Sequence, residues 1–156
     1  MDFLFNISCL RTQNREFIFR RTVFSHGQMK KNKVNDSKHV LNAAGNSEVT
    51  KAKVHIIVEI IEYVPNAVVS KTIIKKTTGN ITVSSFDAGE ELAEKTSPFD
   101  NYIQIIDGAA EVIISGKKFN LKLGEGIVIP AHASHEFCAT EQFKMISTII
   151  KSGYED

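Results

Sequence analysis

Two histidines, His132 and His135, lie three residues apart in the stretch GEGIVIPAHASHEFCA at residues 124–139. Imidazole side chains titrate near neutral pH and are common metal ligands, so the pair suggests metal binding or proton transfer. Pro130 and the turn after it separate the two rings along the chain. We therefore take His135 as the principal candidate and His132 as a substitute metal ligand. The alternative for His135 is a buried ring that hydrogen-bonds a neighbouring strand.

Other reactive side chains form no recognisable constellation in the sequence. Cys9 and Cys138 lack the spacing of a zinc site or a disulfide framework, which favours a reducing compartment and a free, core-facing thiol at Cys138. The sequence also lacks a glycine-rich phosphate loop and a nucleophile elbow. Four carboxylates fall in predicted loops without the geometry of a general acid and base: Asp87, Glu90, Glu91 and Asp100.

The elements that must position His135 are short strands. Turn residues separate eight segments with strand patterns, at residues 67–74, 80–86, 102–106, 110–115, 118–123, 126–129, 135–140 and 143–150. The dipeptide Asp107-Gly108 suits a tight turn, which predicts a hairpin from the two strands on either side of it. Short strands at near-regular spacing, with almost no helix, predict an all-β fold that is a small closed barrel or a double sheet.

A short N-terminal helix is predicted before the first of these strands. Val54, Ile57, Val58 and Ile61 follow the i, i+3, i+4, i+7 spacing of one helical face. The pattern stops before Pro65, as expected for a helix end. The β-branched residues of this segment also permit a strand.

With these elements in place, the chain resembles a cupin, a small double-stranded β-helix barrel of the jelly-roll type. The likeness covers residues 54–150. The second cupin motif runs Gly, five residues, Pro, one residue, Gly, two residues, His, three residues, Asn. Three motif positions are matched, by Gly124, Pro130 and His135. Two are replaced: His132 stands at the second glycine and Ala139 at the asparagine.

The first cupin motif keeps its glycines and loses its metal ligands. Gly89 and Gly108 match its ends in register. Lys95 and Ser97 stand where the two histidines are expected, and Asn101 stands where the glutamate is expected. A metal-binding cupin is expected to hold a divalent ion with three imidazoles and a carboxylate, and a lysine cation would repel that ion. The resemblance therefore implies no cofactor, with a divalent metal at His132 and His135 as an alternative.

The same resemblance implies a binding site at the mouth of the barrel. It places five side chains there, with few fixed charges: Lys95, Ser97, Asn101, Gln104 and His135. Such a set suits a small carboxylate, phosphate or sugar-like ligand, with lysine as a point charge and the others as orienting groups. Two alternatives for Lys95 stay open, a base or imine-forming nucleophile, and a rim side chain among surface glutamates.

We therefore predict a metal-independent cupin that binds a small polar or anionic molecule inside its barrel. Because small cupins commonly pair through sheet edges, the resemblance also implies a homodimer, and a cytoplasmic location follows from cysteine usage. One alternative is a metal-dependent isomerase or oxygenase with an atypical metal site, and another is a structural or interaction module with a vestigial pocket. Whether the protein is an enzyme is left open.

The N-terminal part of the chain differs from the rest in charge. Residues 1–53 carry ten Lys or Arg against four Asp or Glu, a net charge of +6, whereas residues 54–156 carry a net charge of −5. We predict a basic, disordered extension at residues 1–50 and a barrel domain at residues 51–153. No motif predicts nucleic-acid binding, and no apolar run suits a membrane span. The Phe- and Arg-containing start resembles an organelle transit peptide, with a disordered tail or a start at Met29 as alternatives.

Overall fold

The computed structural model describes residues 40–42 and 48–151, which belong to one compact unit beginning at Lys38. These residues form one short 3-10 turn, η1 (Ile57–Glu59), and nine strands. The strands are β1 (Val40–Asn42), β2 (Val68–Lys76), β3 (Gly79–Phe86), β4 (Glu91–Thr96), β5 (Asn101–Ile114), β6 (Lys117–Lys122), β7 (Gly126–Ile129), β8 (Ser134–Cys138) and β9 (Phe143–Ile150). The predicted all-β jelly-roll architecture is confirmed.

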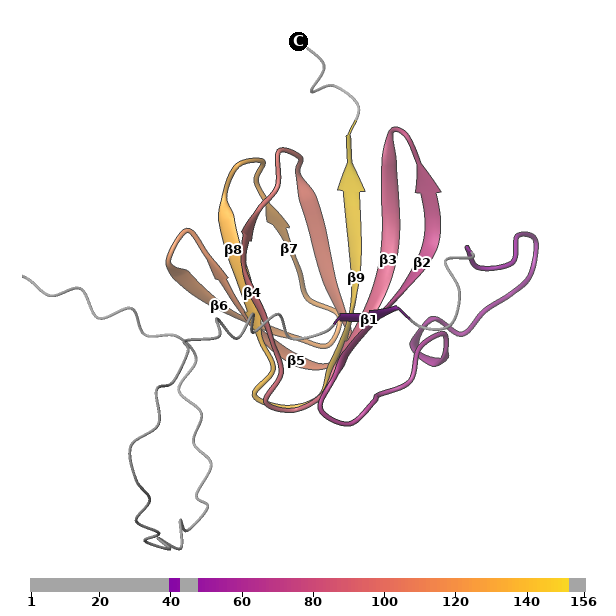
Figure 1. Cartoon of the computed structure of the whole chain (residues 1–156), viewed down its shortest axis with the longest axis horizontal. Coiled ribbons are helices and arrows are strands. Elements are labelled where there is room, and N and C mark those ends of the chain that lie inside the picture. Colours follow the sequence, from indigo (N-terminus) through magenta and orange to yellow (C-terminus); the bar gives the residue numbers. More distant parts are fainter. Residues whose placement is uncertain (1–39, 43–47, 152–156) are drawn as a thin grey trace, which may run out of the picture. The chain divides into compact units, whose positions relative to one another are not determined.

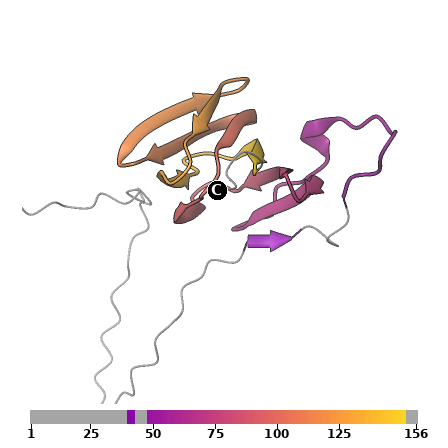
Figure 2. The same cartoon turned by 90° about the horizontal axis from the view of Figure 1, so that it is seen from above.

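A single curled sheet contains all of these strands (Figure 1). Its order is β1-β2-β3-β9-β5-β8-β4, and β6 and β7 each pair with β5. The long strand β5 joins two wings, which we call the β2–β3–β9 wing and the β4–β8 wing. The first half of β5 pairs with β7 and β9, and its second half pairs with β6 and β8. Viewed from above in Figure 2, the two wings are distinct parts of the curled sheet.

The predicted hairpin at Asp107-Gly108 is wrong. Residues 101–114 form one continuous strand with a register shift between Ile105 and Asp107. Gly108 has a φ of 68°, and a side chain there would overlap the Gln142 carbonyl of the segment before β9. The dipeptide therefore bends β5 from one wing into the other without reversing the chain, because residues 101–108 pair with β9 and residues 109–114 pair with β6 and β8.

Strand β4 has no counterpart among the predicted strands. Its sequence, ELAEKT, has one large apolar residue and three charged residues, so it lacks the apolar pattern that predicts a strand. It is the last strand in the sheet order and pairs only with β8 among the described strands, so it is an edge strand. A short, charged edge strand resists pairing with other chains, and it places Lys95 beside His135.

The inner core consists of side chains from both wings. Phe86 and Phe143 stack with ring centroids 4.3 Å apart, and Phe137 of the β4–β8 wing lies 6.2 Å from Phe86. These aromatic rings lie near the end of the fold where β3 and β8 finish, since Gly89 donates a hydrogen bond to the Ala139 carbonyl. The β2–β3, β4–β5 and β7–β8 connections lie at the opposite end (Figure 1).

The predicted short helix is also wrong: its segment contains only the 3-10 turn η1. Ile57 and Ile61 nevertheless pack together against Val69 and Val83 on the outer face of the β2–β3–β9 wing. The helical spacing thus identified two covered side chains, Ile57 and Ile61, whereas Val54 of the same series is 93% exposed. The β-branched residues disfavoured a regular helix.

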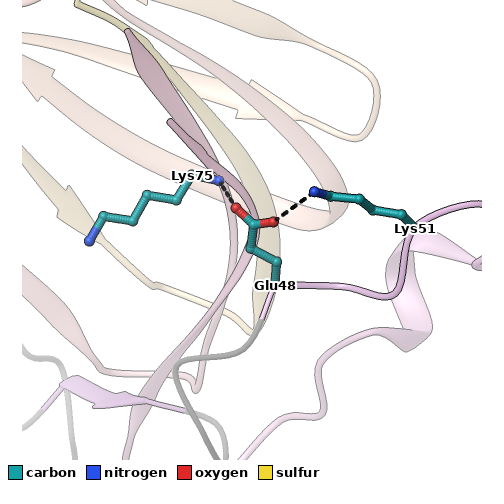
Figure 3. A network of polar contacts seen from close by, with 3 residues as sticks. All are labelled: Glu48, Lys51 and Lys75. Atoms are coloured by element: carbon teal, nitrogen blue, oxygen red, sulfur yellow. Dashed lines mark hydrogen bonds and ion pairs between the residues drawn. The ribbon is translucent and has the colours of Figure 1, made fainter. Parts of the chain in front are cut away.

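Residues 48–63, which precede β2 and include η1, form a segment that covers part of this outer face; we call it the covering segment. Glu48 holds its start against β2 (Figure 3). Its carboxylate accepts a hydrogen bond of 2.7 Å from the Lys75 backbone N–H, and the Lys51 ammonium lies 3.8 Å away. The hydrogen bond from Lys75, with smaller effects of nearby lysines, holds the pKa of Glu48 below its usual value. Glu48 therefore occupies backbone hydrogen-bonding capacity on the part of β2 that β1 does not pair with.

The buried Lys144 holds the other end of the covering segment. Its Nζ donates a 2.7 Å hydrogen bond to the Val58 carbonyl and lies 4.6 Å from the centroid of the Tyr63 ring. The Tyr63 hydroxyl donates to Asp107 at 2.9 Å, and burial, together with that carboxylate, raises the pKa of Tyr63. These contacts give Lys144 a structural role outside the barrel.

Replacing Lys144 with methionine is expected to lower the free energy of unfolding by about 1 kcal/mol, because the side-chain stem remains while the charge-assisted hydrogen bond is lost. Urea denaturation measures the loss, and hydrogen exchange should show faster exchange at residues 56–63. Lys71→Met is the matched control, since Lys71 lies on the same outer face without a hydrogen bond or ion pair among the described residues. Equal stabilities of the two variants would contradict this role.

The predicted extension at residues 1–50 falls mostly outside the described residues. Within it, strand β1 pairs in parallel with Val68–Ser70 of β2. Among residues 40–42 and 48–151, no helix is long and apolar enough to cross a membrane.

Candidate functional site

His135 lies in the middle of the β4–β8 wing. Its register partners on the two neighbouring strands are Lys95 of β4 and Ile114 of β5. The side chain is only 2% exposed, and its ring meets the Phe137 ring edge-on at a centroid distance of 6.0 Å. The imidazole therefore lies on the inner face, one step from the aromatic core.

One nitrogen of the His135 ring makes a hydrogen bond, and the other has no partner among the described residues. Nδ1 lies 3.2 Å from the Ala133 carbonyl oxygen, and because a carbonyl only accepts, Nδ1 must donate. Nε2 has no hydrogen-bond partner among the described residues. No fully buried side-chain nitrogen or oxygen in this part of the chain lacks a partner, so Nε2 must reach solvent. In the neutral ring, Nε2 is therefore an accessible acceptor.

Lys95 projects from the same face of the sheet as His135, because directly paired residues share a face. Its side chain is exposed, yet burial of its surroundings lowers the pKa of Lys95. Both observations fit a side chain at the opening of a curved sheet, which solvent still reaches while protein atoms displace part of its hydration. Lys95 has no ion pair or hydrogen bond among the described residues.

The two groups influence each other electrostatically. Burial lowers the pKa of His135, and the positive charge of Lys95 lowers it further, while the hydrogen bond to Ala133 acts in the opposite direction. The His135 ring is therefore neutral at pH 7, with its free Nε2 beside a lysine cation. This pair offers an acceptor and a positive charge on one surface.

Asn101 adds a side-chain amide from the start of β5, where β5 pairs with β9. It alternates with the buried Ile103 and Ile105 on the inner face of β5 and is 5% exposed. Its Oδ1 accepts a 2.8 Å hydrogen bond from the Ser147 hydroxyl. Its Nδ2 has no partner among the described residues. Since no fully buried side-chain nitrogen or oxygen in that part of the chain lacks a partner, Nδ2 must reach solvent.

Three predicted residues are placed differently. The Ser97 hydroxyl lies 3.1 Å from both the N–H and the carbonyl of Phe99, so it holds a local turn. Gln104 lies on the outer face of β5, because it is one residue out of phase with Ile103, and its amide donates to the Gly124 carbonyl at 3.4 Å. His132 is exposed, and its backbone N–H donates to the Ser97 carbonyl. We leave all three outside the proposed site.

His132 has a φ of 64°, in the left-handed region that favours glycine. This explains why the cupin motif expects glycine at this position. His132→Gly is expected to raise the free energy of unfolding by about 1 kcal/mol, measured by urea denaturation. His132→Ala, which keeps a Cβ atom, should give no such gain. If the two variants are equally stable, backbone conformation does not explain the motif glycine.

Hydroxyl-bearing residues on the inner face of the β2–β3–β9 wing were missed by sequence reasoning. We call them the hydroxyl rows: Ser70, Thr72, Thr82, Ser84 and Ser147. Their signal in the sequence is the alternation of Ser70 and Thr72 in the segment of residues 68–72. That signal is weak, because two hydroxyls are a short pattern and the opposite face of the same strand carries the covered apolar residues Val69 and Ile73.

Comparison with solved structures identifies the fold. A conserved protein of unknown function from Streptococcus pyogenes superposes with a TM-score of 0.64 at 28% identity, over 70% of this chain and 96% of that one. A cupin superfamily protein from Desulfitobacterium hafniense gives 0.63 at 23%, over 69% and 98%. A cupin 2 conserved barrel domain protein from Leptotrichia buccalis gives 0.59 at 35%, over 60% of this chain and 46% of that one. The chain has the cupin fold. No family sequence model and no curated protein matches it by sequence.

The inner residues of this cupin do not fit the metal that the fold commonly holds. The register partner of His135 on β4 is a lysine, which cannot ligate as a cation. Asn101 uses its amide oxygen to accept from Ser147. Among the described residues, no group of three or more His, Cys, Asp or Glu side chains is placed to share a metal ion.

Proposed function

We propose that this cupin binds a small anion, a carboxylate or phosphate, between Lys95 and His135 without a transition metal. The observation that carries the proposal is the Lys95 ammonium, whose pKa is lowered by burial and which has no acidic partner in the described part of the chain. A partly desolvated charge is unfavourable unless it is paired. A bound anion would supply that pairing.

Each inner residue has a distinct role in this proposal. Lys95 contributes the charge, and its position opposite His135 is fixed by strand register. The Nε2 atom of His135 can only accept, so it orients a ligand that carries a hydroxyl, such as a protonated phosphate oxygen, by one hydrogen bond. The Nδ2 atom of Asn101 donates from the first half of β5. Few fixed charges and several orienting groups are typical of small-molecule sites.

Titration calorimetry with inorganic phosphate tests the proposal, at constant ionic strength because phosphate also stabilises proteins by exclusion from their surface. We expect saturable binding to wild type, and loss of that binding in Lys95→Met. Lys71→Met removes a lysine from the outer face and should bind as wild type does. Equal, non-saturating responses of all three proteins to phosphate, acetate and malonate would overturn the proposal and favour a vestigial pocket.

The metal-dependent alternative has its own measurement. Protein purified without an affinity tag should be analysed for Fe, Mn, Ni and Zn, and its melting temperature compared with and without a chelator. We expect substoichiometric metal and no chelator effect. Near-stoichiometric metal with a chelator-sensitive melting temperature would overturn the proposal and favour an isomerase or oxygenase. Homodimer formation stays a prediction, which light scattering of the purified protein would check.

A further inference from the structure

The inner face of the β2–β3–β9 wing carries polar residues in register across three strands. One row pairs Ser70 with Ser84, and the next pairs Thr72 with Thr82 and Thr82 with Ser147. Direct register partners project from the same face. Ser147 is in turn the partner of Ile103, which is fully buried in the inner core, so the hydroxyl rows face the inside of the curled sheet.

These residues satisfy one another only in part. Ser70 and Ser84 share one hydrogen bond of 2.7 Å, and the Asn80 amide donates to the Thr82 hydroxyl at 3.3 Å. Each hydroxyl has one donor and two acceptor positions, so both contacts leave hydrogen-bonding capacity unused. Thr72 has no side-chain hydrogen bond among the described residues. The wing thus presents several spare donors and acceptors beside a core that is otherwise apolar.

The hydroxyl rows and the His135 site lie on the same side of the aromatic core. Ser84 is two residues before Phe86 on β3, and His135 is two residues before Phe137 on β8. Phe86 and Phe137 meet across the wings, and both strands finish at the same end of the fold. A single ligand seated above these two rings would therefore meet the lysine cation on one wing and hydroxyls on the other.

The state of His135 adds a chemical constraint. Its neutral Nε2 carries a lone pair, which accepts a hydrogen bond from a hydroxyl and repels an anionic oxygen. The charge of the ligand must then lie toward Lys95, and a hydroxyl of the ligand toward His135. A plain fatty or aromatic acid offers no such hydroxyl and would leave buried polar groups unpaired.

We infer that the natural ligand is a polyhydroxylated anion, a sugar acid or a sugar phosphate. Its anionic group pairs with Lys95, one hydroxyl donates to Nε2 of His135, and the remaining hydroxyls bond to Asn101 and the hydroxyl rows. The inference rests on the proposed anion site and adds the class of molecule. It also gives a role to polar residues that the anion site alone does not use.

Ligands that differ only in hydroxyl groups or only in charge distinguish the proposed anion site from the inferred preference for a polyhydroxylated anion. Gluconate and hexanoate have the same chain length and charge, and only gluconate carries hydroxyls; sorbitol carries hydroxyls without charge. We expect gluconate or glucose 6-phosphate to bind wild type at least about tenfold more tightly than hexanoate, sorbitol or inorganic phosphate, because each satisfied buried polar group favours the hydroxylated ligand. Whichever of the two binds more tightly distinguishes a sugar acid from a sugar phosphate.

Thr82→Val keeps the shape of the side chain and removes the hydroxyl from the inner face. It should bring the affinity for gluconate toward that for hexanoate. Thr148→Val is the matched control, because Thr148 lies on the outer face of β9 as the partner of Tyr102. Thermal unfolding and amide NMR spectra check that both variants fold.

The outcomes are distinct. Equal binding of gluconate and hexanoate, lost in Lys95→Met, would overturn this inference and leave the anion site intact. Sorbitol binding as tightly as gluconate would overturn it as well, since charge would then be irrelevant. Binding of none of these compounds would overturn the anion site itself. Equal effects of Thr82→Val and Thr148→Val would contradict the role of the hydroxyl rows.

Discussion

Gly108→Ala is expected to lower the free energy of unfolding by about 3 kcal/mol or more, the largest effect of any single change considered for this cupin. Gly108 has a φ of 68°, and an added Cβ would overlap the Gln142 backbone. Backbone atoms cannot move aside as a flexible side chain can. The bend that carries β5 from one wing to the other would therefore be strained or displaced.

Gly116→Ala is the control for this prediction. Gly116 also has a positive φ, of 77°, but no atom lies within 4 Å of the position of an added Cβ. This change should cost only the conformational preference, about 1 kcal/mol. Urea denaturation of both variants measures the difference. Similar losses in the two proteins would show that close packing at the β5 bend is unimportant.

Lys95→Met is expected to weaken phosphate binding at least about tenfold, or about 1.4 kcal/mol, and at the same time to stabilise the ligand-free protein slightly. Burial lowers the pKa of Lys95 from its usual value, so the folded state disfavours the charged form. Stability linked to such a group is present above the unfolded pKa and is lost as pH falls through the folded pKa. At pH 7 the lysine cation therefore destabilises the ligand-free fold, and methionine removes that effect.

The pKa of His135 provides a second measurement of the effect of Lys95→Met. Its pKa is lowered by burial and by Lys95, so its contribution to stability is full above the unfolded value near 6.5 and is lost as pH falls through the lowered value. In Lys95→Met one cause of the lowering is gone, and the pKa of His135 should rise. NMR titration of the His135 ring measures it, with Lys71→Met as control. An unchanged His135 pKa would contradict the proximity of the two side chains.

Some strands could be predicted from local sequence alone. The bounds predicted for β7 and β9 match the structure, because short apolar runs between turn residues specify both ends of each strand. Strand β4 could not be predicted, because its charged residues carry no apolar pattern and only pairing with β8 makes it a strand. The helix predicted before β2 failed for the opposite reason: Ile57 and Ile61 of its apolar pattern are covered by packing against the sheet, without forming a helix.

Some residues of the candidate site could likewise be predicted from the sequence, and others could not. His135, Lys95 and Asn101 were found by their positions in the cupin motifs, and the structure places all three on inner faces. The outward direction of Gln104 depends on its phase within β5. The structure shows that Ile103 and Ile105 are buried in the core, which places the intervening Gln104 on the outer face.

Residue types and local spacing were enough to predict the all-β class and the motif glycines and proline. Comparison with the cupin motifs added the replacement of the metal ligands by Lys95, Ser97 and Asn101. Three features required the folded structure: the cross-strand pairing of Lys95 with His135, the absence of a partner for Nε2 of His135 among the described residues, and the inward direction of the hydroxyl rows. Strand register joins residues far apart in the chain and is set by packing of the whole sheet, so local sequence does not reveal it.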